Sequence, residues 1–155
     1  MIEIERKFLV VSESYKKNIL SVHNIRQGYL CVDPKRSVRI RIIDEKGHIT
    51  VKGSTSKDGL SRFEWEKEIS KADAKKLIML CESNIIEKTR TLVEYKGSTF
   101  EVDEFHSNNT GLIIAEIELK NKNQYFEKPP WLGKEVTGVK KYYNSQLTQI
   151  PYSKW

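Results

Sequence analysis

Apolar and polar residues alternate along most of the chain, in short runs that turn residues separate. Alternation with a period of two is typical of β-strands that bury one face and leave the other polar. The separators contain pairs such as Asp33-Pro34 and Lys96-Gly97, which favour tight turns. The pattern predicts eight strands, at residues 2–11, 25–33, 36–44, 48–54, 61–69, 84–95, 98–105 and 112–121. This spacing is typical of an antiparallel barrel or sandwich.

Three further stretches predict helices. The first is short and lies near residues 13–20. The second is the clearest, because Ser70 is a good N-cap and Asp73 lies in the first turn. Its apolar face contains Ala74, Leu77, Ile78 and Cys81. The third begins near Lys140 and carries Tyr143, Leu147 and Ile150.

The chain has 155 residues, which is the length of one domain with a real core. Hydrophobic residues make up 38% and the charges have both signs, so the chain is globular rather than disordered. The connector from Phe126 to Leu132 is interpreted as surface packing. We therefore expect a single domain over residues 1–155, α+β in class and mainly antiparallel β, with a few peripheral helices.

The polar positions of the strands are largely charged, and like charges stand two residues apart. Such pairs are Glu3 and Glu5, Arg39 and Arg41, Glu101 and Asp103, and Glu116 and Glu118. A solvated sheet face usually mixes the two signs, because neighbouring like charges repel. An ordinary charged outer face is the alternative interpretation, since antiparallel sheets often have one. If the sheet closes, the charged face lies inside, where eight strands leave room for one small ligand.

Buried charges need opposite charges or bound ions. Carboxylates bind hard cations such as Mg²⁺ or Mn²⁺, and Arg and Lys bind phosphate oxygens. A triphosphate with its metal satisfies both sets of charges. The chain carries 27 Lys and Arg against 21 Asp and Glu, a net charge of +6, which also favours an anionic partner. Nucleic acid fits less well, because acidic residues are interleaved with the basic ones.

At the N-terminus, Glu3-Ile4-Glu5-Arg6-Lys7 resembles the ExExK signature of the CYTH, or triphosphate tunnel metalloenzyme, superfamily. The other landmarks of that family follow in order along essentially the whole chain. They are Gln27-Gly28-Tyr29-Leu30, Arg39-Ile40-Arg41, Thr50-Val51-Lys52-Gly53, Arg62-Phe63-Glu64-Trp65-Glu66, Lys88-Thr89-Arg90, Glu101-Val102-Asp103, Ala115-Glu116-Ile117-Glu118-Leu119, Glu135-Val136-Thr137 and Lys141-Tyr142-Tyr143-Asn144.

The resemblance implies an eight-stranded closed β-barrel, a triphosphate tunnel, that acts on triphosphates with Mg²⁺ or Mn²⁺. Residues expected to bind the triphosphate are Lys7, Arg39, Arg41, Lys52, Lys88, Arg90 and Lys141 (or Lys140), joined by Arg62 from the charged face. The expected metal ligands are Glu3, Glu5, Asp103, Glu116 and Glu118. Glu5, Lys7, Glu116 and Glu118 are expected to take part in catalysis, and Glu64, Glu66 and Glu101 are further lumen candidates.

Inorganic tripolyphosphate is the first substrate hypothesis, because the chain has little beyond the tunnel strands to hold a nucleobase or thiamine. The alternatives are a nucleoside triphosphatase or a class IV-type adenylate cyclase, and, in another class, a non-catalytic module that binds polyphosphate or nucleic acid. The physiological substrate, the metal and the oligomeric state stay open.

Other functional classes are disfavoured. No apolar run approaches the roughly 20 residues of a membrane helix, and the acidic start at Glu3 is unlike a signal or transit peptide. Two cysteines, Cys31 and Cys81, are interpreted as packing residues in a reducing, cytoplasmic setting. The three histidines, His23, His48 and His106, stand singly in the sequence, and the proposed chemistry needs no nucleophilic side chain.

Overall fold

The computed structural model describes residues 1–82 and 84–155, and at residue 83 it describes only the backbone. Its strands are β1 (Ile2–Val10), β2 (Ile19–Asp33), β3 (Arg36–Ile43), β4 (Lys46–Gly53), β5 (Ser61–Ile69), β6 (Glu82–Tyr95), β7 (Ser98–Phe105), β8 (Ile113–Glu118) and β9 (Leu132–Glu135). Its α-helices are α1 (Lys71–Ile78) and α2 (Asn144–Gln149). The 3₁₀ helices η1 to η4 span Glu13–Asn18, Ser107–Asn109, Lys140–Tyr142 and Tyr152–Lys154.

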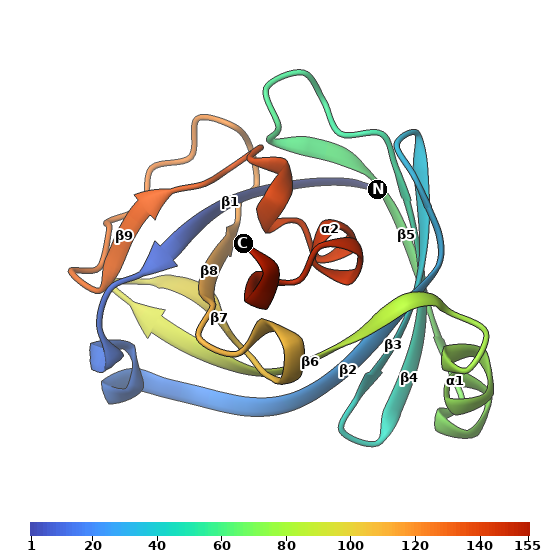
Figure 1. The fold of residues 1–155 in the computed structure, drawn as a ribbon. Coiled ribbons are helices and arrows are strands. Elements are labelled where there is room, and N and C mark those ends of the chain that lie inside the picture. The colour runs from blue at the N-terminus through green and yellow to red at the C-terminus, as the bar shows by residue number, and fades with distance from the viewer.

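Strands β1 to β8 close into an antiparallel barrel, which Figure 1 shows nearly end-on. The order around the wall is β5-β4-β3-β2-β6-β7-β8-β1, and a further pairing joins β1 back to β5. The extra strand, β9, pairs with β1 outside this circuit. The eight-stranded closed barrel predicted from the sequence is therefore confirmed, with one strand added.

β1 closes the barrel because it pairs with different strands along its two edges. It pairs with β8 over Glu5–Leu9, and with β5 over Ile2–Ile4 on the opposite edge. Further along that second edge, β9 takes over at Phe8 and Val10. The short β1–β5 contact is thus the place where the circuit of strands is joined.

Two glycines meet beside this junction, one in the loop before β5 and one in the loop after β9. Gly59 and Gly138 both have positive φ angles, of 76° and 74°. A Cβ added to Gly59 would lie 2.6 Å from the Cα of Gly138. Only glycine combines this backbone conformation with such a close approach, so these two residues let the loops pack together next to the tunnel.

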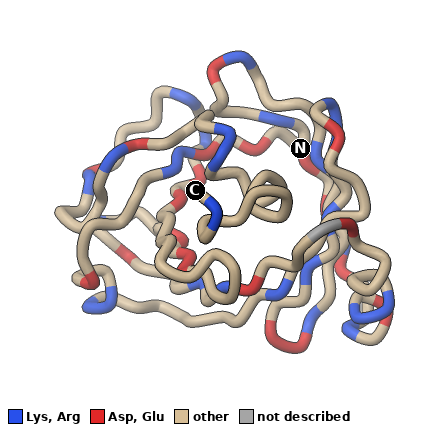
Figure 2. The backbone as a smooth tube through the Cα atoms, in the orientation of Figure 1, with Lys and Arg blue, Asp and Glu red and all other residues tan. Residues whose placement is uncertain are grey.

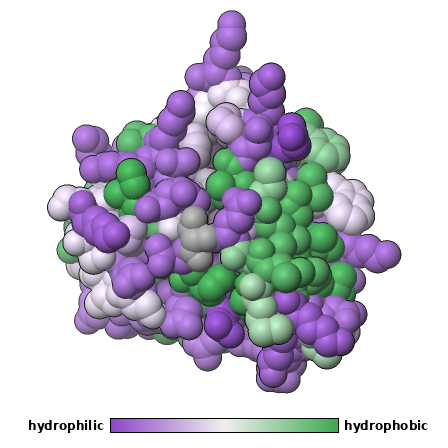
Figure 3. Space-filling view, turned by 45° about the vertical axis from the view of Figure 1, so that its right-hand side comes forward, coloured by the Kyte–Doolittle hydropathy of each residue, from purple (hydrophilic) through white to green (hydrophobic). Residues whose placement is uncertain are grey.

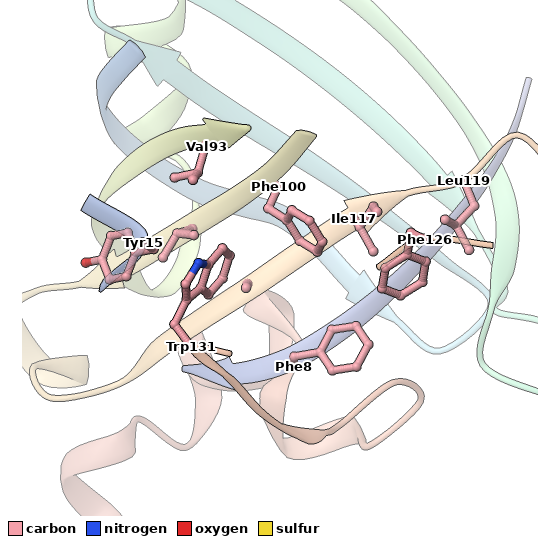
Figure 4. Packing of buried hydrophobic residues seen from close by; sticks show 10 residues of the cluster. Phe8, Tyr15, Val93, Phe100, Ile117, Leu119, Phe126 and Trp131 are labelled. Atoms are coloured by element: carbon pink, nitrogen blue, oxygen red, sulfur yellow. The ribbon is translucent and has the colours of Figure 1, made fainter. Parts of the chain in front are cut away.

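The largest apolar cluster lies on the outer wall of β1, β6, β7 and β8 (Figure 4). Its buried members are Phe8, Tyr15, Val93, Phe100, Val102, Ala115, Ile117, Leu119, Phe126 and Trp131. The ring of Phe100 meets Trp131 edge-on at 5.4 Å and Phe126 at 6.0 Å. The connector predicted to pack at the surface is therefore part of the core, because its aromatic rings cover the apolar face of the wall.

A second apolar cluster lies inside the barrel. Ile86 and Ile114 share the inward face of their strands with Lys88 and Glu116, two positions along. They pack with Phe105, Leu112 and Leu147, and Leu147 comes from α2. Figure 1 accordingly shows α2 within the ring of strands. The C-terminal segment thus fills the apolar part of the interior and leaves the charged part to the cavity described below.

The structure corrects several predicted boundaries. The first helix is a 3₁₀ segment that ends at Asn18, and β2 begins at Ile19 rather than at residue 25. The last predicted strand, 112–121, ends at Glu118, and β9 was not predicted. The helix expected from Lys140 is divided into η3, α2 and η4, because the segment bends to follow the barrel interior. The helix at Ser70 is confirmed, and the Ser70 hydroxyl accepts from the backbone N–H of Asp73.

The inward anchor of α2 generates a stability prediction. Leu147 is 0% exposed, whereas Ile150, at the end of the same helix, is 59% exposed. We expect Leu147→Ala to lower the free energy of unfolding by about 2–5 kcal/mol, because it leaves a cavity. The matched change Ile150→Ala should cost less than about 0.5 kcal/mol. Urea denaturation measures both, and equal effects would contradict the inward packing of α2.

Candidate active site in the charged tunnel

The inward side chains of the barrel surround a cavity of about 160 Å³. Figure 2 shows Lys, Arg, Asp and Glu distributed around the barrel wall. Apart from one amide, the side chains that line the cavity are charged. Seven are cationic and six are acidic: Lys7, Arg39, Arg41, Lys52, Arg62, Lys88 and Arg90, and Glu3, Glu5, Glu64, Glu101, Glu116 and Glu118, with Asn144 as the amide. This density of charge in one cavity is typical of a site for an ionic ligand.

Asp103 forms the most deeply buried ion pairs of the site. It lies on β7 opposite Arg90 of β6. Arg90 donates two hydrogen bonds of 2.7 Å to its carboxylate, and Lys88 donates a third at 2.6 Å. Burial lowers the pKa of Lys88 to about 8, with Arg90 adding to the effect, although Asp103 opposes it. Asp103 therefore fixes the positions of two cations from behind the cavity lining.

Lys7 and Glu116 form a second buried pair across the register of β1 and β8. Lys7 also lies 3.0 Å from Glu5, and Arg90 donates to Glu116 at 3.4 Å. Burial alone would raise the pKa of Glu116, but Lys7, Arg90 and Lys88 hold it well below its usual value. Glu116 is therefore an anion at neutral pH and connects the two groups of cations.

A third group joins β1, β4 and β5 at the other side of the cavity. Lys52 donates to both carboxylate oxygens of Glu3 at 2.9 Å, and Arg62 donates to Glu3 at 3.0 Å. Lys52 also lies 2.6 Å from Glu64. Burial lowers the pKa of Lys52, and the charges of Arg39 and Arg62 lower it further. The cations here are close enough together that their repulsion is incompletely neutralised.

Arg41 shows the same deficit of negative charge. Burial lowers its pKa to about 10, and Arg39 and Arg90 add to the shift. Its guanidinium donates to Glu66 at 3.1 Å, and Glu66 also accepts from Thr50 at 2.7 Å. One carboxylate thus serves two arginines, because Arg39 lies 3.6 Å from the same oxygen. An anion in the cavity would complete the neutralisation.

Several buried polar atoms of the tunnel strands have no hydrogen-bond partner among the described residues. They are the Nε atoms of Arg39 and Arg41, Nδ1 of His48 and both amide atoms of Gln27. Gln27, Arg41 and His48 are direct neighbours across β2, β3 and β4. Because buried polar groups are nearly always satisfied in folded proteins, these atoms are those expected of a site that takes a polar ligand.

The carboxylates Glu3, Glu5 and Glu118 form the acidic end of the cavity. Glu118 lies opposite Glu5 in the β1–β8 pairing. Burial raises the pKa of Glu118, and repulsion from Glu3, Glu64 and Glu5 raises it further. A divalent cation would relieve this repulsion, and oxygen ligands are those that Mg²⁺ and Mn²⁺ prefer.

In the described residues Glu3 and Glu5 form ion pairs with Lys and Arg, and no group of three carboxylates converges in a ready ligand set. The donor set therefore fits a metal by its chemistry, while its geometry is that of ion pairs.

Known proteins resemble this chain in both sequence and fold. The CYTH domain family model matches residues 1–151. The chain belongs to the CYTH family. An inorganic triphosphatase of Acetivibrio thermocellus is 47% identical over 151 residues, covering 97% of this chain and 95% of that protein. An inorganic triphosphatase of Nitrosomonas europaea is 36% identical over 152 residues, covering 95% and 97%.

The solved structures agree with this assignment. The crystal structure of the inorganic triphosphatase NE1496 has a TM-score of 0.69 at 32% identity, and the match covers 94% of this chain and 93% of that one. The PH1012 protein of Pyrococcus horikoshii has a TM-score of 0.63 at 22% identity, over 78% and 80%, and supports the fold alone. CYTH triphosphatases are divalent-metal dependent. In the described part of this CYTH chain, none of the helices has the length and apolarity needed to span a bilayer.

The structure brings most of the site residues predicted for this CYTH chain to one cavity. Three of them do not line it. Asp103 is buried behind the lining, where it pairs with Lys88 and Arg90, whereas the more exposed Glu66 pairs with Arg39 and Arg41. Lys141 lies outside, on η3, with its ammonium 4.4 Å from the centre of the Trp155 ring. Its distance from the cavity follows from the division of the C-terminal helix, which turns this residue toward the aromatic end of the chain.

Asn144, which the sequence did not single out, reaches the cavity from the first residue of α2. Its side-chain oxygen accepts from Lys88 at 3.3 Å. Tyr29 and Tyr143 line an adjoining chamber of about 30 Å³ beside Lys7, Arg39 and Lys52. Asn144 ends the landmark run Lys141-Tyr142-Tyr143-Asn144, but only the entry of α2 into the barrel shows which residue of that run turns inward.

Removing the charge of Asp103 tests the buried pairs. The side chain of Asp103 is 1% exposed, and that of Glu66 is 31% exposed. We expect Asp103→Asn to lower the free energy of unfolding by about 3–5 kcal/mol, since Lys88 and Arg90 lose their buried counter-ion. Glu66→Gln should cost less than about 1 kcal/mol, because water screens its ion pairs. Denaturant unfolding measures the free energy of unfolding of both variants. A smaller loss for Asp103→Asn than for Glu66→Gln would refute the role of Asp103.

Proposed function

We propose that this chain hydrolyses inorganic triphosphate to pyrophosphate and phosphate with a divalent metal ion. The observation that carries the proposal is the cavity itself. It measures about 160 Å³ and is lined by charged side chains and one amide, with no apolar or aromatic side chain among the described lining residues. Pockets for drug-sized organic ligands are larger, about 300–1,000 Å³, and mostly apolar. A short phosphate chain fits this lining, whereas a nucleobase does not.

The two signs of charge support a joint ligand of metal and phosphate. Five of the six carboxylates described in the lining form ion pairs with its cations, as Glu3 does with Lys52 and Arg62. Phosphate oxygens would replace those carboxylates on the cations, and the released carboxylates would bind the metal. This exchange keeps the charges of these ion pairs neutralised throughout binding. The names of the two curated relatives, both inorganic triphosphatases, agree with it.

The distribution of charge within the tunnel indicates where phosphate and metal would bind. The small chamber beside Tyr29 contains Lys7, Arg39, Lys52 and Arg62 and, among the described residues, no carboxylate. Glu3, Glu5 and Glu118 lie in the main cavity, on the first and last of the paired strands β1 and β8. Because Lys7, Lys52 and Arg62 line both spaces and pair with Glu3 and Glu5, phosphate oxygens and metal ligands would meet around these three cations.

The chemistry is phosphoryl transfer to water, and the protein supplies position and charge. Arg39, Arg41 and Arg90 bind non-bridging oxygens and neutralise the charge that develops on the leaving pyrophosphate. Glu5, Glu116 and Glu118 are acceptors that can orient the attacking water and receive its proton. Lys7 holds Glu116 and Glu5 in place through its ion pairs. The divalent metal, held by the carboxylates when bound, supplies charge neutralisation and lowers the pKa of bound water.

A nucleoside triphosphatase is the second candidate, and one observation favours it. A groove of about 540 Å³ lies next to the tunnel and shares Arg62, Tyr143 and Ser145 with its chambers. Val32 and Pro34 give this groove an apolar portion. A nucleoside attached to the phosphate chain would lie there. The comparison of tripolyphosphate with ATP separates the two candidates.

Phosphate release from tripolyphosphate, ATP and thiamine triphosphate, each with Mg²⁺, Mn²⁺ or EDTA, tests the proposed function. We expect kcat/KM for tripolyphosphate to exceed that for ATP at least about 10-fold, because the lining has no apolar contact for a base. EDTA should abolish release. A preference for ATP would support the second candidate, and the product, ADP or cyclic AMP, would separate a triphosphatase from a cyclase. Metal-independent binding without turnover, weakening steeply with salt, would indicate a binding module.

Arg39→Ala tests the phosphate-binding role of the cations. Loss of a hydrogen bond to a charged group costs about 1.5–3 kcal/mol, so KM for tripolyphosphate should rise roughly 10- to 100-fold. Lys141→Ala is the matched control, because that ammonium lies outside the cavity on the Trp155 ring. Its KM should stay within about twofold. Steady-state kinetics at saturating metal measure both, and an unchanged KM for Arg39→Ala would remove this residue from the site.

A further inference from the structure

An uncovered apolar face lies on the outside of the barrel, away from the tunnel. Figure 3 shows it as a continuous hydrophobic area on the side formed by β3, β4 and β5. We call it the outer patch and define it by Ile2, Leu30, Val38, Val51, Phe63, Trp65 and Leu80. Trp65 is 47% exposed, Phe63 49%, Ile2 62% and Leu80 70%.

The strand register makes the outer patch continuous. Val38 of β3, Val51 of β4 and Trp65 of β5 are direct cross-strand partners. Phe63 lies two positions from Trp65 on the same face and pairs with Ile2 of β1. These residues alternate with the lumen residues of the same strands, so they point outward. The patch is thus the outer surface of the wall whose inner surface is the charged cavity.

The neighbouring half of this same sheet face is covered. Ile40 and Ile42 lie in the next rows of β3 and are buried beneath Ala74 and Ile78 of α1. Cys81, directly after α1 and Leu80, packs in the same cluster as Leu30. The helix therefore ends where the outer patch begins. The outer patch is apolar like the part of the sheet face that α1 buries. The helix α1 therefore covers only part of this sheet face.

The outer patch is large enough to form the apolar centre of a protein interface. Ile2, Phe63, Trp65 and Leu80 each expose on the order of 100 Å², given their exposed fractions and the 150–250 Å² of a large side chain. With the half-buried Val38 and Val51 the total is about 500 Å², near the upper range for a patch on a monomer. A standard interface buries about 800 Å² on each partner. The patch supplies the apolar centre of such an interface.

The outer patch is apolar and uncharged, and it therefore favours a partner surface that is also apolar. Among the described residues its outward side chains are uncharged, and the cations Arg36 and Lys67 lie at its border. Such a surface offers nothing to a nucleic acid or an acidic peptide. A second copy of this chain presents the same apolar sheet face, and two sheets pack well face to face. Twofold dimers are also the commonest assembly of soluble chains.

We propose that the outer patch is the interface of a symmetric homodimer, in which Trp65 and Phe63 of one copy pack against the outer patch of the other. The interface lies on the outer side of the barrel wall, so it does not cover the charged cavity on the inner side. The proposal is independent of the reaction at the charged cavity. Because each chain carries a net charge of +6, salt should strengthen association by screening the repulsion between the copies.

Sedimentation equilibrium of the full chain tests the proposal. We expect a mass of twice 18.1 kDa at concentrations on the order of 10 µM, by mass action. Trp65→Glu and Phe63→Lys should each raise the dissociation constant at least about 100-fold, since each places a charge in the apolar centre. The matched control is Tyr125→Glu, because Tyr125 is 84% exposed and lies outside the outer patch. This control should remain dimeric.

Phosphate release from tripolyphosphate and circular dichroism report whether each variant is folded. If Trp65→Glu loses both, Phe63→Ser serves in its place, because this smaller change removes the ring without adding a charge. A wild-type chain that stays at 18.1 kDa at ~100 µM would overturn the proposal, since a standard interface associates well below that concentration. So would dimers that persist in every folded patch variant, or association that weakens as salt is raised. Absence of triphosphatase activity in a folded dimer would refute the proposed function and leave the dimer standing.

Discussion

Mutual neutralisation of charge inside the barrel is the interaction on which the rest of the structure depends. Thirteen charged side chains line one cavity, and removing one partner of a buried pair costs several kcal/mol. Adjacent strands supply the two signs: Arg90 of β6 meets Asp103 of β7, and Lys7 of β1 meets Glu116 of β8. The register that closes the barrel is therefore the register that pairs the charges. A slip of one residue would turn each strand inside out.

Apolar packing on both surfaces of the wall makes this interior possible. The aromatic cluster around Phe100 and Trp131 secures the outside of β7 and β8, while α1 covers part of β3 and β4. Leu147 fills the apolar end of the interior and carries Asn144 to the edge of the charged cavity. The cavity is small because this helix occupies the remaining space. Size and charge together then favour a short inorganic anion over an organic triphosphate.

The barrel wall also separates the outer patch, where we propose dimerisation, from the charged cavity. Each strand of the β3–β5 wall has alternating side chains, so one face forms the charged cavity and the other forms the outer patch. Trp65 and Glu64 are neighbours in sequence, yet they lie on opposite surfaces of the wall. A partner can therefore cover the outer patch without touching the tunnel. The alternation that places charged side chains in the cavity also places apolar side chains on the outer patch.

The sequence by itself determined most of the strands and which charged side chains share a face, because a period of two fixes this whatever surrounds them. Glu3, Glu5 and Lys7 share a face for that reason alone, and the closure of the barrel at the β1–β5 pairing turns that face inward. Tertiary structure decided the positions that depend on distant partners. β9 forms only where β1 offers an edge, and Phe126 and Trp131 are core only because the outer wall is apolar. Because the C-terminal segment bends, Asn144 lines the cavity and Lys141 lies outside it. Local pattern carries no information about those long-range contacts, so no periodicity could have placed these residues.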